Sequence, residues 1–146
     1  MKIFLLCLCL VGLVFANENN NLSPEAQCEN GNALSCFKLG ESFSKICLDE
    51  QNFDIGAKAI KYYEKVCSAK QEPACFMVAF MYSTNQCAPR NIELAQKYAK
   101  ISCDEERQSD ACGLYARSEG LNEQEKQKYL QKACEYNERW CHKVNK

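Results

Sequence analysis

Apolar residues recur at helical spacing in three segments, each of which ends at a cysteine. The segments cover 57–67, 92–103 and 125–134, and none of them contains glycine or proline. In each segment a tyrosine stands five residues before the final cysteine, and these are Tyr62, Tyr98 and Tyr129. This pattern predicts three amphipathic helices with the tyrosine on the apolar side. We therefore expect the three tyrosines to pack inside the fold.

A second type of helical segment begins at a cysteine, over 36–43, 75–82 and 112–117. In each copy a large apolar residue is followed by a small one, as in the pair Leu39 and Gly40. A small residue at a fixed phase lets a neighbouring helix approach closely. Because glycine inside a helix costs about 1 kcal/mol relative to alanine, Gly40 predicts close packing at that point.

The two segment types alternate, so the chain is expected to form helical hairpins. We call the segments that begin at a cysteine A helices and those that end at one B helices. A single hairpin cannot bury its apolar face, whereas stacked hairpins share one continuous core. The sequence therefore predicts an all-α repeat domain over 24–146, with about three repeats and a half-unit at either end.

The cysteines fall at the connections between each B helix and the next A helix. The pairs are separated by six to eight residues, and their regular placement predicts one disulfide per connection. The predicted bridges are Cys28–Cys36, Cys67–Cys75, Cys103–Cys112 and Cys134–Cys141.

Cys47 and Cys87 stand outside these pairs. They follow Cys36 and Cys75 by eleven and twelve residues, which predicts that both lie in A–B turns, at 45–49 and 85–90. Equivalent points of stacked hairpins are about 8–10 Å apart, beyond the roughly 7 Å between Cα atoms that a disulfide tolerates. Turns can lean together, however, and the cysteine count is even, so we predict a fifth bridge, Cys47–Cys87. The alternative is two exposed thiols available for partner capture or redox exchange.

The N-terminal residues have the pattern of a secretory signal peptide. Lys2 precedes an apolar run that ends near Ala16, and the run is too short to span a bilayer. We predict a signal peptide over 1–16, which removes Cys7 and Cys9, and a polar disordered leader over 17–23. The mature protein is then expected to be secreted or periplasmic, with no membrane span.

Charge and composition exclude several classes of partner. The net charge is −1 and no basic stripe is present, so nucleic acid is not an expected partner. No pair of cysteines has C-x2-C spacing and His142 is the one histidine. Because metal sites favour such spacing with histidine partners, we expect neither a metal nor another cofactor.

At this point the residues resemble a known family. Sel1-like repeats carry a Cys-x-x-Leu-Gly start on helix A and an Ala-x-x-Tyr-Tyr-x-Lys-Ala-Cys end on helix B. The segments 36–40 and 59–67 follow these patterns closely, and the disulfide-stapled form resembles the Helicobacter cysteine-rich protein family. The resemblance covers 28–141 and implies a short right-handed α/α solenoid of TPR/Sel1-like hairpins. The glycine-rich A–B turn usual in such repeats is missing here.

The first functional hypothesis is a scaffold that binds an unknown protein or peptide. Stacked hairpins form a concave groove lined by successive A helices. The alternative is that Phe76, Phe80 and Met81 are ordinary core residues. The candidate groove residues are Lys38, Glu41, Ser42, Met77, Phe80, Met81 and Arg117.

The second hypothesis is an enzyme, and it comes from the resemblance. Members of the cysteine-rich family are described as penicillin-binding proteins or weak β-lactamases, so the resemblance implies a β-lactam or a peptidoglycan-related small molecule as ligand. Ser42 and Lys45 match the S-x-x-K string of serine β-lactamases, but the S-D-N and K-T-G partners are absent. The alternative for Ser42 and Lys45 is a solvent-facing helix end.

Overall fold

The computed structural model describes residues 22–69 and 73–144; the predicted signal peptide and residues 17–21 of the predicted leader lie outside them. The described residues form helices and no strand, as the sequence predicts. None of these helices is long and apolar enough to cross a membrane. The helices are α1 (Pro24–Glu29), α2 (Ala33–Glu50), α3 (Phe53–Ala69), α4 (Ala74–Thr84), α5 (Ile92–Asp104), α6 (Ser109–Ala116), α7 (Glu123–Tyr136) and the 3-10 helix η2 (Glu138–Lys143).

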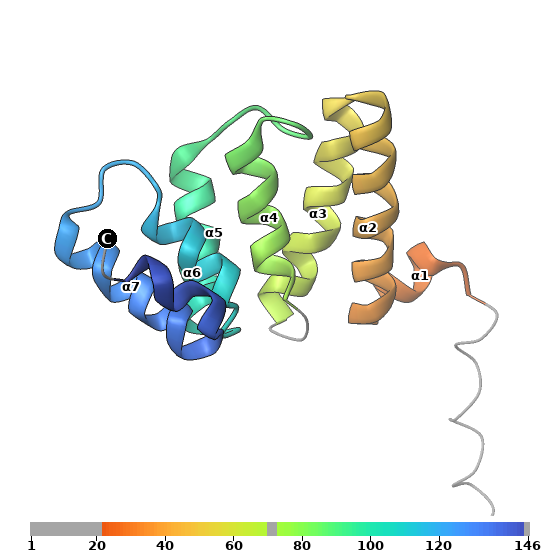
Figure 1. The fold of residues 1–146 in the computed structure, drawn as a ribbon. Helices are drawn as coiled ribbons and strands as arrows, with labels where there is room; N and C mark the ends of the chain where they lie inside the picture. The colour runs from red at the N-terminus through yellow and green to blue at the C-terminus, as the bar shows by residue number, and fades with distance from the viewer. Residues whose placement is uncertain (1–21, 70–72, 145–146) are drawn as a thin grey trace, which may run out of the picture.

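The helices pack in chain order, each against the next (Figure 1). Three antiparallel hairpins result: α2 with α3, α4 with α5, and α6 with α7. The short helix α1 packs on α2 at one end, and η2 packs on α7 at the other. These hairpins correspond to the predicted A and B helices, and α1 and η2 correspond to the terminal half-units.

Short polar residues begin most of the helices. Asn32, Asn91 and Asn122 are the N-caps of α2, α5 and α7, and each side-chain oxygen accepts a hydrogen bond from a backbone N–H in the first turn, at 2.9, 3.0 and 2.8 Å. Ser23, which we had assigned to the leader, caps α1 in the same way. A side-chain oxygen at the N-cap satisfies a backbone donor that the helix leaves unpaired, which fixes where each helix begins.

All ten described cysteines form disulfides, and the five bridges are the pairs that the sequence predicts. Four of them join a B helix to the next A helix, with Cα atoms 4.5 to 4.8 Å apart. The fifth, Cys47–Cys87, joins the first hairpin to the second. Exposed thiols at Cys47 and Cys87, the alternative we had left open, do not occur in this structure.

The predicted position of Cys47 in a turn is wrong. Helix α2 continues to Glu50, so Cys47 lies in its last full turn, and the chain reverses at Gln51, which has a φ of 52°. The Cα atoms of Cys47 and Cys87 are only 5.7 Å apart because the loop after α4 folds back over α3 (Figure 1). Gly56 of α3 permits this approach: a Cβ atom there would lie 1.7 Å from the carbonyl oxygen of Cys87.

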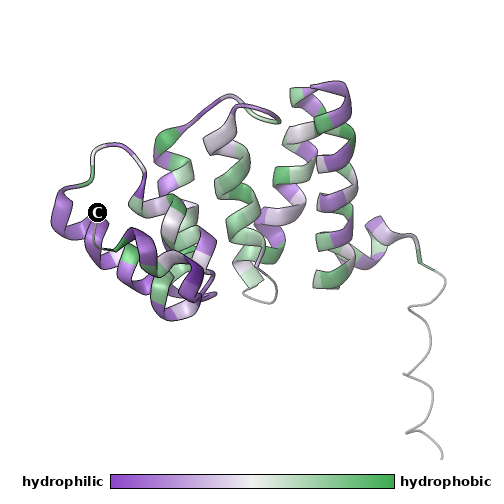
Figure 2. Ribbon diagram, in the orientation of Figure 1, coloured by the Kyte–Doolittle hydropathy of each residue, from purple (hydrophilic) through white to green (hydrophobic). Residues whose placement is uncertain are grey.

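Two clusters of buried residues form the core. The first lies between α2, α3 and α4 around Tyr63, which is fully buried, and the second lies between α5, α6 and α7 around Tyr129. Gly40 serves packing, as predicted: a Cβ atom there would lie 2.7 Å from the Tyr63 ring. Figure 2 shows apolar residues along α4, between the two clusters, and hydrophilic residues over much of α7.

The repeated tyrosine position has a different role from the one we expected. Tyr129 is 1% exposed, as predicted, but Tyr62 and Tyr98 are only half-buried. Tyr98 and Tyr129 each donate a hydrogen bond to an acidic residue on the preceding B helix, at 2.7 and 3.0 Å. Tyr62 lacks a full preceding B helix and stacks on Phe43 instead. The repeated position therefore links successive B helices rather than filling the centre of a hairpin.

Candidate functional site

The predicted groove residues do not form one surface. Lys38 and Glu41 are exposed on α2, and Phe80 is 40% exposed on α4. Met77 is half-buried against the first core. Met81 is only 4% exposed, and its sulfur accepts a hydrogen bond from Ser44. The alternative interpretation therefore holds for Met81, which is a core residue and offers no surface to a partner.

The pair Ser42 and Lys45 is not arranged for nucleophilic catalysis. Both residues are exposed on α2, and the Ser42 hydroxyl donates to the carbonyl oxygen of Lys38 at 2.9 Å. No hydrogen bond joins Ser42 to Lys45 in the described part of the chain. A nucleophilic serine needs a base positioned to take its proton, so the geometry of this pair gives no support to β-lactam chemistry.

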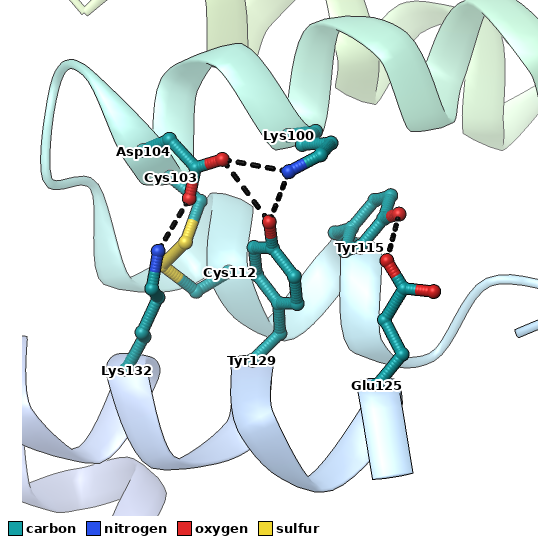
Figure 3. Close-up of polar contacts among 8 residues, drawn as sticks. All are labelled: Lys100, Cys103, Asp104, Cys112, Tyr115, Glu125, Tyr129 and Lys132. Atoms are coloured by element: carbon teal, nitrogen blue, oxygen red, sulfur yellow. Dashed lines mark hydrogen bonds and ion pairs between the residues drawn. A yellow bond between two sulfur atoms is a disulfide. The ribbon is translucent and has the colours of Figure 1, made fainter. Parts of the chain in front are cut away.

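A group of charged side chains surrounds the hydroxyl of Tyr129, beside the Cys103–Cys112 bridge (Figure 3). Asp104 accepts hydrogen bonds from Lys100 at 2.8 Å, from Lys132 at 2.6 Å and from Tyr129 at 3.0 Å. Lys100 also donates to the Tyr129 hydroxyl. The residues come from α5 and α7, so the group ties the second B helix to the third.

The hydrogen bonds within this group favour the charged forms of Asp104, Lys100 and Lys132. Burial alone would raise the pKa of Asp104, but the hydrogen bonds from Lys100, Lys132 and Tyr129 keep that pKa below its usual value. The hydrogen bonds to Asp104 in turn raise the pKa of Lys100 and of Lys132. Because the Tyr129 side chain is 1% exposed, its ring is closed to a substrate. The group is therefore a structural link between helices.

A second cluster has the residue types of a metal site. The sulfur atoms of Cys67 and Cys75 and a carboxylate oxygen of Glu106 lie within 4.8 Å of one another. The two sulfurs form a disulfide, however, and metals bind thiolates. Glu106 instead accepts a hydrogen bond from the backbone N–H of Cys75 at 3.3 Å, in the first turn of α4, whose N-cap Pro73 provides no side-chain cap. Burial raises the pKa of Glu106. Its observed role is to cap α4, the helix that pairs with α5.

A cavity of about 230 Å³ lies between the second and third hairpins. Its floor is apolar and its rim is polar, with the ion pair of Arg90 and Glu119 at 2.7 Å. Gln96 also donates to the backbone oxygen of Glu119, at 2.6 Å, which fixes the connection after α6. The lining residues are Ser83, Arg90, Ile92, Ala95, Gln96, Ala99, Leu114, Tyr115, Arg117, Ser118 and Glu119.

Tyr115 is the aromatic residue that lines the cavity, and it contacts Tyr129 of the charged group. Tyr115 packs edge-to-face on Tyr129, with ring centroids 4.4 Å apart, and its hydroxyl donates to Glu125 at 2.8 Å (Figure 3). Burial, together with this hydrogen bond, raises the pKa of Tyr115 to about 12. Tyr115 is therefore a neutral hydrogen-bond donor at physiological pH, and its ring has a fixed orientation in the cavity.

Arg117 lies at the C-terminal end of α6 and is held in place by two contacts. Its Nε donates to the carbonyl oxygen of Gly113 at 3.0 Å, and its guanidinium lies 5.1 Å from the centroid of the Trp140 ring. Trp140 comes from η2 and donates to Asp110 at 3.0 Å. A Cβ atom at Gly113 would lie 2.1 Å from the Trp140 ring, so only glycine lets the indole lie on α6 in this way.

Arg117 is the one predicted groove residue that lines the cavity. Sequence reasoning missed the rest of the rim, because Arg90 and Glu119 belong to connections whose course cannot be predicted from helical periodicity. The sequence did contain a signal that a large side chain such as Trp140 packs on α6. Gly113, like Gly40, is a glycine inside a predicted helix, and it indicates that a large side chain lies close to α6.

No protein-family model matches this chain, and no curated protein is significantly similar to it.

Proposed function

We propose that this chain is a secreted or periplasmic Sel1-like repeat protein, a short right-handed α/α solenoid that acts as a binding scaffold for a protein or peptide segment. The five disulfides support an oxidising compartment. The row of three hairpins, with half-units at its ends, supports the repeat architecture. A rigid array of this kind offers surfaces between its units where an extended segment can lie.

The observation that carries the proposal is the cavity between the second and third hairpins. It combines an apolar floor with the exposed guanidinium of Arg117, and small-molecule and peptide sites have this composition. Phe80, which is 40% exposed, precedes the cavity residue Ser83 by three positions on α4. Residues at this spacing share one helix face, so Phe80 extends the apolar surface beyond the cavity.

The size of the cavity favours part of an extended segment over a large ligand. Its volume of about 230 Å³ is below the roughly 300–1,000 Å³ of sites for drug-sized ligands. A single side chain of a partner fits such a space while the rest of the segment lies along the surface.

Filling the cavity tests the proposal. Ala95 lines the cavity and is 7% exposed, so Ala95→Leu places a larger side chain inside it. Ala57 is an exposed alanine on α3, and Ala57→Leu is the matched control. Peptides selected from a displayed library on the oxidised protein are expected to lose binding to the first variant and keep it on the second.

Both variants are checked by circular dichroism, so that lost binding is not confused with unfolding. Equal binding of the selected peptides to a folded Ala95→Leu variant would contradict a site in this cavity.

A further inference from the structure

Several hydrogen-bond donors around the cavity are already used in contacts within the protein and are not available to a ligand. The hydroxyls of Ser83 and Ser118 donate to the carbonyl oxygens of Phe80 and Tyr115, each three residues earlier in the chain. These protons are not available to a ligand. Arg90 already has a carboxylate partner in Glu119.

Arg117 is different from these groups. Its Nε is used by the Gly113 carbonyl, but no carboxylate of the described chain pairs with its guanidinium. The two terminal nitrogens therefore remain as a pair of parallel donors at the edge of the cavity. This planar fork matches the two oxygens of a carboxylate.

The guanidinium of Arg117 is also held in one orientation in the absence of a ligand. Trp140 lies under Arg117 and is anchored by its own hydrogen bond to Asp110, and Arg139 forms an ion pair with the same aspartate. A side chain held in one orientation loses little conformational entropy when it binds a ligand. The half-unit η2 therefore has a role beyond closing the array, because it orients the one uncompensated cation of the cavity.

The charge of the cavity agrees with an anionic ligand. Among its lining residues Arg90 and Arg117 are positive and Glu119 is negative, which leaves a net charge of +1. The whole chain has a net charge of −1, so this local excess is opposite in sign to the charge of the protein.

We infer that the cavity recognises a carboxylate beside an apolar side chain, with Arg117 binding the carboxylate and Trp140 positioning Arg117. This inference rests on the proposed binding function of the cavity. An acidic side chain within a partner segment and the free end of a chain both supply this group, and apolar residues such as Leu114 and Ile92 receive its neighbour.

Short synthetic peptides provide the test. The probe is Ala-Leu-Glu-Leu-Ala with both ends blocked, compared with the same blocked peptide carrying glutamine in place of glutamate. A third peptide carries glutamine and a free C-terminal carboxylate, which separates a chain end from an acidic side chain. Binding is followed by NMR titration of the oxidised, isotopically labelled protein. Shifts are expected at the backbone amides of Ser83, Leu114 and Arg117.

We expect the glutamate peptide to bind about tenfold more tightly than its blocked glutamine analogue, as the loss of one charge-assisted pair implies. Arg117→Gln should abolish this preference. The matched control is Arg107→Gln, because Arg107 also stacks on an aromatic ring, 4.9 Å from the centroid of Tyr136, but does not line the cavity.

The role of Trp140 has its own readout. Trp140→Leu leaves the charge of Arg117 in place but removes the ring that positions it. The ratio of affinities for the glutamate and glutamine peptides should therefore fall towards the ratio expected for Arg117→Gln. The affinity for the glutamine peptide should stay unchanged. A structural role alone would weaken both peptides equally.

The outcomes separate the inference from the proposed function. Equal binding of the glutamate peptide and both glutamine peptides at the cavity would overturn the carboxylate inference and leave the scaffold proposal standing. If none of the three peptides shifts a cavity amide of the folded protein, the result counts against both. If the Arg117→Gln variant still preferred the glutamate peptide, another cation would bind the carboxylate and the role inferred for Arg117 would be wrong.

Discussion

The two interfaces between successive hairpins are built in different ways. The first, between α2–α3 and α4–α5, is closed by the Cys47–Cys87 bridge and by the close approach of Cys87 to Gly56. The second, between α4–α5 and α6–α7, has only the short bridge Cys103–Cys112 at the connection between its hairpins and no second bridge. Charged side chains around Tyr129 hold it together instead, and it contains the cavity.

The difference follows from the length of the A helices. Helix α2 has 18 residues and α4 has 11, whereas α6 has only 8. The third A helix therefore ends early, and no cysteine occurs in the connection over 117–122. The cavity lies where α6 stops, and Arg117 is at its C-cap. The interface between hairpins is thus closed by a second bridge where the A helix is long, and contains a cavity where the A helix is short.

The largest expected effect is the loss of the bridge across the first interface. Cys47 and Cys87 are 40 positions apart in the sequence, whereas Cys134 and Cys141 are 7 positions apart. In the chain-entropy model a bridge contributes more as its loop lengthens, about 4 kcal/mol for the long loop and about 2.5 kcal/mol for the short one. Replacing both cysteines of a pair by serine, followed by urea unfolding, should show this order. A larger loss from Cys134→Ser with Cys141→Ser would contradict it.

Two of the close-packed glycines, Gly56 and Gly113, should also differ in the stability lost on substitution. At Gly56 an added methyl group meets the backbone of Cys87, which the disulfide holds in place, and at Gly113 it meets the Trp140 side chain of the terminal half-unit. We expect Gly56→Ala to cost about 3 kcal/mol and Gly113→Ala about 1 kcal/mol, within the range for overpacking. Melting temperatures measure both. Equal losses would indicate that η2 is as firmly held as the loop around Cys87.

A smaller effect is expected from the tyrosine hydroxyl at the second interface. Tyr129→Phe keeps the ring against Tyr115 but removes the hydrogen bond to Asp104. Because Lys100 and Lys132 still satisfy Asp104, the loss in the free energy of unfolding should be about 1 kcal/mol. The contribution should decrease at high salt, since the group is partly exposed to solvent. An unchanged unfolding free energy would show that the hydroxyl does not hold α7 to α5.

The pH dependence of the second interface should be the smallest effect. The pKa of Asp104 is lowered from 3.8 in the folded state. The stabilisation by its charged form is therefore complete above that value and is lost as the pH falls through the lowered pKa. The difference in stability between the natural protein and Asp104→Asn should accordingly narrow below about pH 4. A difference that stays constant from neutral to acidic pH would exclude this role for the carboxylate.

Much of the fold could be predicted from the sequence, because helical periodicity and cysteine spacing are local properties. Gly40 and the cysteine pairs were correctly interpreted on this basis. Cys47 was misplaced because nothing in its local sequence marks the end of α2, which continues to Glu50. Tyr62 and Tyr63 are adjacent, and only the neighbouring helix decides that Tyr63 fills the core.

The candidate site was less predictable than the fold. Arg117 was recognised as a surface residue of an A helix, but its partner Trp140 is 23 residues away in a different unit. The cavity itself depends on where α6 ends and on the Arg90–Glu119 ion pair between two connections. Such features arise from packing between hairpins, which no periodicity along one chain segment records.

Amide hydrogen exchange in the oxidised protein tests the contrast between the two interfaces most directly. We expect the slowest exchange in α3 and α4, where the covalent bridge and the first core meet, and faster exchange in α6 and α7. Raising the salt concentration should accelerate exchange in α7 more than in α3, because the ion pairs of Asp104 with Lys100 and Lys132 lie at the second interface. Protection in α6 and α7 equal to that in α3, with no response to salt, would contradict the contrast.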